Sequence, residues 1–435
     1  MKSTMLFSLS YRLATCSSAY GFPALAQQSG SDDAEGPIAE LIGETWRNPS
    51  DTLSILLLIG GDVVLKALAQ LSGRRVVPVA FSFGWVAYSF NTLMSVCGDG
   101  RLMPKPDYPA KLINAKSGFV RENRSWVLGR LLRDSERPLP GDVGLCITVY
   151  QASVTARHGV PDLDWCWWGG VVIIILQLAF SAIPFALYGD WSIFTVTSAG
   201  TVLALITGAL PQWRDEKWAC RKNPKKLFCL TGGNGTRSAM VILSNGNGLD
   251  LEDLAGAESP MVPRRGQNQP PTAFGLPITF LLTQVASLIL AVLWIVILIT
   301  VTGIDEHAWY LLLVGGLGML QNAIVAGARR GIGTSGIHLE VVEEFSRRKV
   351  MHAIMDLEQA YPSTGRPLLS EFFPNESKLR EDEVKWWSGD RTEYDEKRKE
   401  TEAYRDCILK EETVSPETDP KQARRNHQAT LGKGR

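Results

Sequence analysis

Long stretches without a charged side chain constrain this chain more than any other feature. Charged residues make up 21% of its 435 residues, yet five stretches contain none: residues 76–98, 165–189, 191–213, 266–304 and 308–328. A helix of about 20 apolar residues crosses the roughly 30 Å hydrocarbon layer of a bilayer. The stretches lack the alternation of barrel strands, so they read as helices. We therefore predict an α-helical polytopic membrane protein; the alternative is one large soluble core.

A further segment, residues 52–71, has the length of a membrane span but contains two charges. Asp62 and Lys66 lie four residues apart, so a helix places them on one face, where they can form an ion pair. A charge at the bilayer centre costs about 2.5–3.5 kcal/mol, which leaves two interpretations. Either this is a sixth transmembrane helix whose pair faces the bundle interior, or it is an amphipathic interfacial helix and five transmembrane helices remain.

Lys and Arg cluster in the long loops and after the last apolar stretch, and are absent from the short links near residues 190 and 305. Cytoplasmic loops are enriched in these residues. We therefore predict that the loops 99–164 and 214–273 and the C-terminus are cytosolic, in the plasma membrane or an endomembrane. Residues 165–213 and 274–328 then form two membrane helix hairpins.

This topology creates a conflict in the region 52–98, which is predicted to contain two membrane helices. If residues 52–71 cross the membrane, Arg74 and Arg75 lie on the outside, against the charge rule. A cleaved signal peptide at residues 1–26 would favour five spans instead. These residues combine Lys2, an apolar run and Ala-Leu-Ala at 24–26, but they also fit a mitochondrial transit peptide or an untargeted tail. Residues 27–51 are a polar N-terminal segment.

The two long loops contain signals of a small cytosolic α/β module. Residues 143–151 read as a strand, and residues 226–243 as a β-hairpin around Gly232-Gly233-Asn234-Gly235. A lone hairpin is marginal in water, so we predict that the first strand pairs with it. Residues 249–255 are predicted to be a short helix beside this sheet, and residues 256–273 a Pro-rich linker.

The C-terminal region is strongly charged. Apolar side chains recur at helical spacing from Leu339 to Tyr361, which predicts an amphipathic helix within the region 329–388. It is expected to pack on the cytosolic module, or else on a partner helix or the membrane surface. Residues 389–435 carry many charges and few apolar side chains, so we predict a disordered tail.

No catalytic, metal-binding or cofactor-binding motif is recognisable. The five histidines lack the spacing of metal ligands. The glycines at 232–235 lack the spacing and the lysine of a P-loop. The zero net charge argues against nucleic-acid binding. We expect no cofactor, no metal and no nucleotide. Glycosylation sequons begin at Asn123, Asn234 and Asn375, and their predicted cytosolic position predicts that none is modified.

Two function classes remain open. Nearly half of the chain is predicted to be soluble, which favours a non-enzymatic scaffold or regulator that presents loops and tail to cytosolic protein partners. The alternative is a transporter or channel for a small solute or ion, with Asp62 and Lys66 in the pathway. The same pair can instead lock helix packing. Polar side chains within the apolar stretches are predicted to bond between helices: Asn91, Gln177, Gln284, Gln321 and Asn322.

Four segments within roughly residues 45–330 carry a resemblance: LIGGDVVLKALAQ, VAFSFGWVAYSF, LPQWRDEKWACRKNPKK and the run containing GNG and NGLDLEDLA. They resemble an uncharacterised family of fungal multi-pass integral membrane proteins with no assigned activity. The resemblance implies a membrane protein and no ligand or catalytic residue. In that family we expect a basic residue at the position of Gly232, so an anion site is not expected here.

Overall fold

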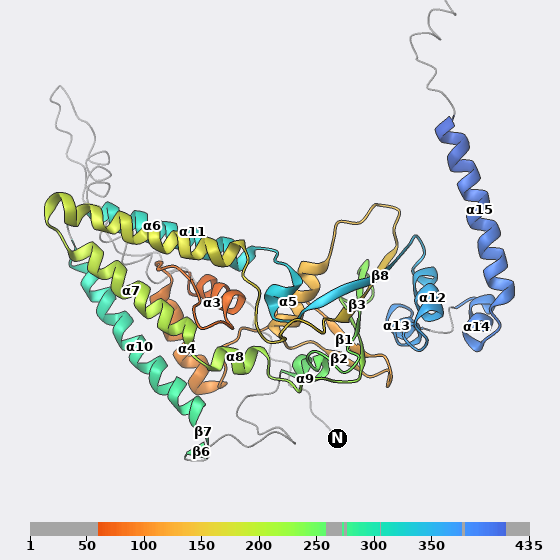
Figure 1. Cartoon of the computed structure of the whole chain (residues 1–435), viewed down its shortest axis with the longest axis horizontal. Coiled ribbons are helices and arrows are strands. Elements are labelled where there is room, and N and C mark those ends of the chain that lie inside the picture. Colours follow the sequence, from red (N-terminus) through yellow and green to blue (C-terminus); the bar gives the residue numbers. More distant parts are fainter. Residues whose placement is uncertain (1–59, 258–271, 274–275, 305, 376–378, 415–435) are drawn as a thin grey trace, which may run out of the picture. The chain divides into compact units, whose positions relative to one another are not determined.

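The structure is a computed structural model, and it describes residues 60–257, 272–273, 276–304, 306–375 and 379–414 (Figure 1). The chain separates into residues 1–47 and residues 48–435, and only the second unit contains described residues. The predictions for residues 1–26 and 27–51, and for the first part of the segment 52–71, residues 52–59, therefore lie outside the described part.

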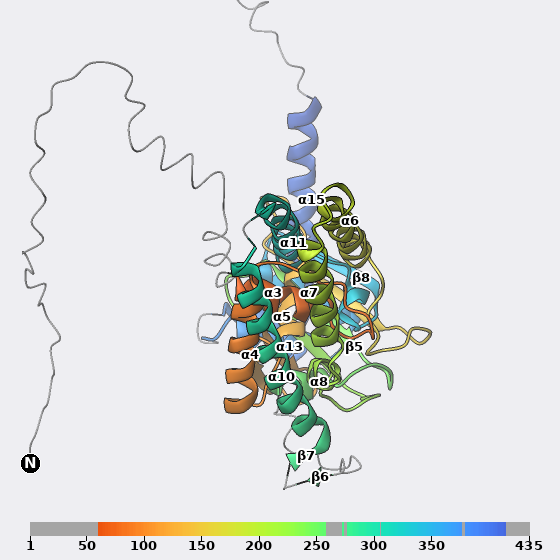
Figure 2. The ribbon, with the colours of Figure 1, turned by 90° about the vertical axis from the view of Figure 1, so that its left-hand side faces the viewer.

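Four helices in the described part are long and apolar enough to cross a membrane. They are α6 (Trp165–Tyr188), α7 (Ser192–Ala209), α10 (Ile278–Thr302) and α11 (Ala308–Gly327). Helix α6 packs against α7 and α11, and α10 packs against α7 and against the shorter helix α4 (Trp85–Gly98), as both ribbon views show (Figures 1 and 2). The four helices fit the predicted membrane class, and they form two helix pairs joined by short links.

The predicted continuous helix over residues 76–98 is wrong. Helix α3 (Gly61–Leu71) is followed by extended chain, and only Trp85–Gly98 is helical as α4. The extended residues Val77, Val79 and Phe81 are as buried as any in the protein. Composition alone does not separate an apolar helix from an apolar strand-like segment that neighbouring helices enclose.

The segments outside the long apolar helices build the predicted sheet, and the described part gives it six strands in the order β2-β1-β4-β5-β3-β8. Strand β3 pairs in parallel with β5, which confirms that the first loop joins the hairpin. All other neighbouring strands are antiparallel. The strands are β1 (Lys111–Asn114), β2 (Val120–Glu122), β3 (Leu145–Ala152), β4 (Leu227–Thr231), β5 (Ser238–Leu243) and β8 (Leu339–Arg347).

Helices cover both faces of this sheet. On one face α5 (Trp126–Ser135) and α9 (Leu251–Gly256), the predicted short helix, pack over Phe228, Met240 and Ile242. On the other face α12 (Val350–Ala360) and α13 (Gly365–Phe372) pack over Cys229, Val241 and Ile147. Because successive side chains of a strand point to opposite faces, the sheet contributes to two separate apolar cores, one on each face.

Two predictions about the C-terminal region are corrected. Residues 339–361 are not one helix but strand β8 followed by α12, because β8 pairs with β3 along its length. Residues 392–414 are not disordered but form α15 (Thr392–Val414), whose Arg398 is ion-paired with Asp356 of α12 at 2.6 Å. The remaining elements are α8 (Gln212–Lys217), β6 (Thr272–Ala273), β7 (Leu276–Pro277), η1 (Ile332–Ser335) and α14 (Glu381–Ser388).

Candidate functional site: a buried extended segment and a charged junction

The chain that follows α3, together with α4, enters between the long helices and returns to the side from which it came. At one end the Ser72 carbonyl oxygen accepts a hydrogen bond from Lys217, and at the other the Gly100 carbonyl oxygen accepts one from Gln212. Both donors belong to the single short helix α8. Between these ends, Phe81 lies against Gln177 in the middle of α6. Residues 72–100 therefore form a re-entrant hairpin, which we call the re-entrant segment.

Side-chain amides satisfy the backbone of the re-entrant segment where it is extended. The Gln177 Nε2 atom donates to the carbonyl oxygens of Phe81 and Val314, each at 2.7 Å. The Asn322 Nδ2 atom donates to the Ala80 carbonyl oxygen at 3.2 Å and to the Ser82 hydroxyl at 3.0 Å. Non-helical backbone is tolerated at membrane depth only where protein or water replaces the missing bonds. Gln177 thus bonds between α6 and α11, as predicted, and both Gln177 and Asn322 also bond to this segment.

Glycines on the surrounding helices make room for the segment. A Cβ atom at Gly318 of α11 would lie 1.7 Å from the Phe81 carbonyl oxygen, and one at Gly170 of α6 would lie 2.1 Å from that of Pro78. One at Gly200 of α7 would reach the Phe81 ring. Three different helices therefore lack side chains where this backbone passes.

Aromatic rings fill the space beside the segment. The Trp294 ring of α10 stacks on Trp85 with centroids 5.4 Å apart and lies parallel to Phe81 at 6.2 Å. All three side chains are fully buried or nearly so. The segment is consequently packed in a filled core.

A buried charged junction lies where the long helices meet the sheet. Arg330, just after α11, donates from Nε and Nη2 to the two carboxylate oxygens of Asp164, both at 2.7 Å. Its Nη1 donates to the Gln70 carbonyl oxygen of α3 at 2.7 Å, and its backbone N–H to Asp134 of α5. Asp164 also caps the first turn of α6. One arginine thus connects the ends of α3, α5, α6 and α11.

Lys217 and Glu216 of α8 extend this junction. Lys217 Nζ donates to the carbonyl oxygens of Ala69, Gln70 and Ser72, which lie at the end of α3 and have no backbone partner within the helix. Burial, together with the positive charge of Arg330, lowers the pKa of Lys217 well below its usual value. Glu216 accepts from the backbone N–H groups of residues 102 and 103, and burial raises its pKa.

Asp62 and Lys66, the residues selected from the sequence, do not form the predicted pair. Asp62 is exposed, Lys66 is half-buried, and no ion pair joins them. Sequence reasoning missed Lys217 and Arg330 as buried charges. Both lie beside helix ends in the charged motifs RDEKW and GARRG. From the sequence, these charges predict only that the loops are cytosolic, and so they were not considered as buried residues.

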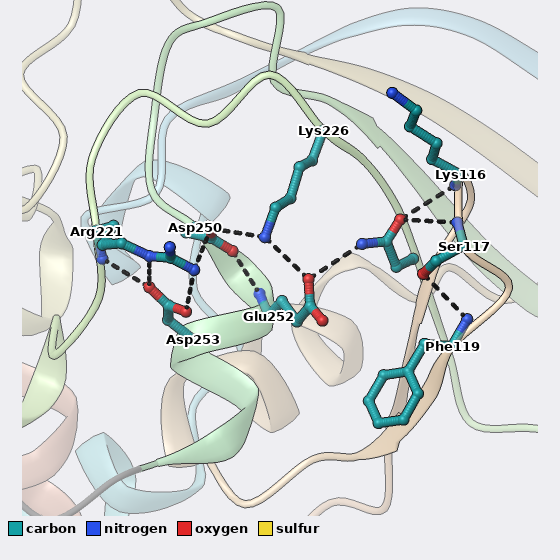
Figure 3. A network of polar contacts seen from close by, with 9 residues as sticks. Lys116, Ser117, Phe119, Arg221, Lys226, Asp250, Glu252 and Asp253 are labelled. Carbon is teal, nitrogen blue, oxygen red and sulfur yellow. Dashed lines mark hydrogen bonds and ion pairs between the residues drawn. The ribbon is translucent and has the colours of Figure 1, made fainter. Parts of the chain in front are cut away.

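A second polar network holds α9 on the sheet (Figure 3). Arg221 donates to both carboxylate oxygens of Asp253 at 2.7 and 2.9 Å, and Lys226 bridges Asp250 at 3.0 Å and Glu252 at 2.9 Å. Every carboxylate in this network is bonded to a cation. Its role is therefore the placement of α9.

Among the residues that the structure describes, no group of three or more His, Cys, Asp or Glu side chains is arranged to hold a metal ion. Comparison with known proteins adds no relative: no family model, no curated protein and no solved structure matches this chain.

Proposed function

We propose that the protein is a non-enzymatic membrane scaffold that holds its α/β module against one face of the bilayer. The charged junction carries this proposal. Arg330 bonds at once to α3, to α5 of the module and to Asp164 at the start of α6. A buried, fully bonded arginine at such a place fixes the angle between the two parts, because a rotation would leave charges unpaired.

The proposed topology has four crossing helices and one re-entrant segment, instead of six or five spans. Both ends of residues 72–100 bond to α8, so Arg74 and Arg75 lie on the module side. Arg74 indeed donates to the Pro161 carbonyl oxygen at 2.8 Å. This removes the conflict with the charge rule and supports a cytosolic module and C-terminus.

Strand β8 supports the presentation of a partner surface. It is the last strand of the sheet among the described residues, and Val341 and Val342 are 53% and 48% exposed. An open strand edge with exposed apolar side chains is a common place for a partner strand to add. We propose that cytosolic protein partners bind at this edge.

Site-specific photo-crosslinking in cells tests the scaffold. A benzoylphenylalanine at Val342 should yield one discrete cross-linked species, whereas the matched position Phe119, exposed at the other end of the sheet, should yield none. Equal patterns at both positions, or none at either, would contradict a partner at β8.

A transport role is the second candidate, and one observation favours it. Non-helical segments among membrane helices often line the substrate sites of transporters. Purified protein in liposomes should then conduct ions, and Asp62→Asn or Lys66→Met should abolish that flux without loss of folded protein. The scaffold proposal expects no flux above that of protein-free liposomes, since the carbonyl oxygens of Ala80 and Phe81 are already bonded.

A further inference from the structure

A large groove runs along the outside of the re-entrant segment. Its wall consists of α3, α4, the chain from Asp99 to Pro106, and the residues Asn123 and Arg124. Its volume is about 990 Å³, at the upper end of the roughly 300–1,000 Å³ range of small-molecule sites.

The lining of the groove changes along its length. Near the start of α3 and in α4 it is uncharged, with Gly61, Leu65, Tyr88 and Ser95. The distance along α4 from Tyr88 to its last residue, Gly98, is about 15 Å at 1.5 Å per residue. Phe90 and Met94 of α4, 41% and 75% exposed, lie on another face of this helix and add apolar surface outside the groove.

The other half of the groove is basic. Arg101, Lys105 and Arg124 line it together with one carboxylate, that of Asp99. Arg101 donates to the Ala257 carbonyl oxygen. Lys105 and Arg124 are exposed, and neither is ion-paired with another described residue. The groove therefore has an excess of positive charge at the end nearest the module.

A buried hydroxyl adds a polar group between the two halves. Tyr88 is 1% exposed, its hydroxyl lies beside Thr92, and it has no hydrogen-bond partner at bonding distance. Both residues line the groove. A buried hydroxyl in such a place can donate to an ester or phosphate oxygen of a ligand.

We propose that this groove binds one phospholipid with an anionic headgroup. The headgroup lies at Arg101, Lys105 and Arg124, and an acyl chain follows α4 past Leu65. Basic pockets beside membrane helices on the cytoplasmic side are suited to anionic headgroups. The inference goes beyond the scaffold role and requires only that the long helices lie in a bilayer.

Native mass spectrometry of the full-length, delipidated protein tests the proposal. Dioleoyl phosphatidylserine should bind more tightly than dioleoyl phosphatidylcholine. The double variant Lys105→Gln/Arg124→Gln should lower the affinity for phosphatidylserine roughly 10-fold, because each basic residue near an anionic lipid contributes several-fold. The matched control Lys116→Gln/Lys222→Gln removes the same charge from exposed lysines outside the groove and should bind as the wild type does.

Two further measurements separate a lipid site from a soluble-anion site. Ser95→Trp fills the uncharged half without a change in charge, and it should weaken phosphatidylserine binding as well. Glycerophosphoserine, which has the headgroup but no acyl chains, should bind far more weakly than the lipid. Three outcomes would each overturn the proposal: equal affinity of the protein for the two phospholipids, equal effects of the groove and control variants on phosphatidylserine binding, or binding of glycerophosphoserine as tight as that of phosphatidylserine. If the double variant does not fold, the proposal is tested by the affinities of the wild type for the two phospholipids and glycerophosphoserine, and by the Ser95→Trp variant.

Discussion

Arg330 and Asp164 face each other in a bidentate ion pair, with both nitrogen–oxygen distances at 2.7 Å. The two side chains are 3% and 14% exposed. Removing one partner of such a buried pair leaves an uncompensated charge. The pair therefore gives a direct way to weaken the connection between the long helices and the module.

Arg330→Met should lower the free energy of unfolding by about 3–5 kcal/mol, because Asp164 then stays buried without its cation. Denaturant titration in detergent micelles measures this. Arg348→Met is the matched control, since Arg348 and its partner Asp142 are 46% and 51% exposed. The control should lose at most about 1 kcal/mol. Similar losses for both variants would mean that the junction is not buried.

Gly318→Ala should destabilise the protein by about 3 kcal/mol, at the upper end of overpacking effects, because its Cβ would collide with the Phe81 carbonyl oxygen. Gly316→Ala on the same helix has no atom within 4 Å of its Cβ and should be neutral or stabilising by up to about 1 kcal/mol. Thermal unfolding followed by tryptophan fluorescence compares them. Equal behaviour of the two alanine variants would contradict the position of the re-entrant segment.

Cysteine accessibility tests the path of the re-entrant segment. In a Cys97→Ser background, Arg75→Cys and Asp99→Cys, both at exposed positions, should react with an impermeant maleimide from the same side of sealed vesicles. Glu306→Cys, in the link between α10 and α11, should react only from the other side. A transmembrane helix over residues 76–98 would instead put the first two cysteines on opposite sides.

His352 of α12 should make the C-terminal helices sensitive to acid. Burial, with the nearby charges of Arg398 and Lys349, lowers the pKa of His352 to about 4. The unfolded chain binds this proton near pH 6.5, so it holds more protons than the folded chain between pH 6.5 and 4. Stability should therefore fall as the pH drops through that window, by at most about 3 kcal/mol.

Hydrogen–deuterium exchange of peptides from α12, corrected for the intrinsic effect of pH, measures this change. His352→Gln should flatten the dependence, while its protection at pH 7 stays close to that of the wild type. If the wild type and His352→Gln both lose exchange protection steeply as the pH falls, groups other than His352 cause the acid sensitivity.

The predicted elements that were correct depend on local pattern. The glycines between β4 and β5 favour a tight turn, and the charge-free lengths of α6, α7, α10 and α11 fit a bilayer. That β3 joins the hairpin followed from the instability of a lone hairpin, whereas its parallel pairing with β5 was not predicted. These inferences needed only residues close in sequence, or the general rule that a two-stranded hairpin is not stable alone in water.

The errors arose where distant residues decide the structure. Residues 76–84 are as apolar as a helix, and their extended form depends on Gln177 and Asn322, far along the chain. Val342 and Phe345 are three residues apart, a spacing that fits one face of a helix but opposite faces of a strand. Pairing with β3 nevertheless makes this segment a strand. The charged junction likewise joins residues of four elements, so no single segment indicates it.

The dependence of residues 80–82 on later parts of the chain has a consequence for biosynthesis. Phe81 and Gln177 are 96 positions apart, and Ala80 and Asn322 are 242 apart. While the ribosome is still producing α10, the amide that bonds the Ala80 carbonyl oxygen does not yet exist. Until the last apolar helix arrives, the Ala80 N–H lacks its acceptor Gln321, and the Ala80 carbonyl oxygen has only the Trp85 ring N–H, at 2.9 Å, as a donor. Assembly of the N-terminal half of this protein is therefore completed only after the C-terminal helix hairpin has entered the bilayer.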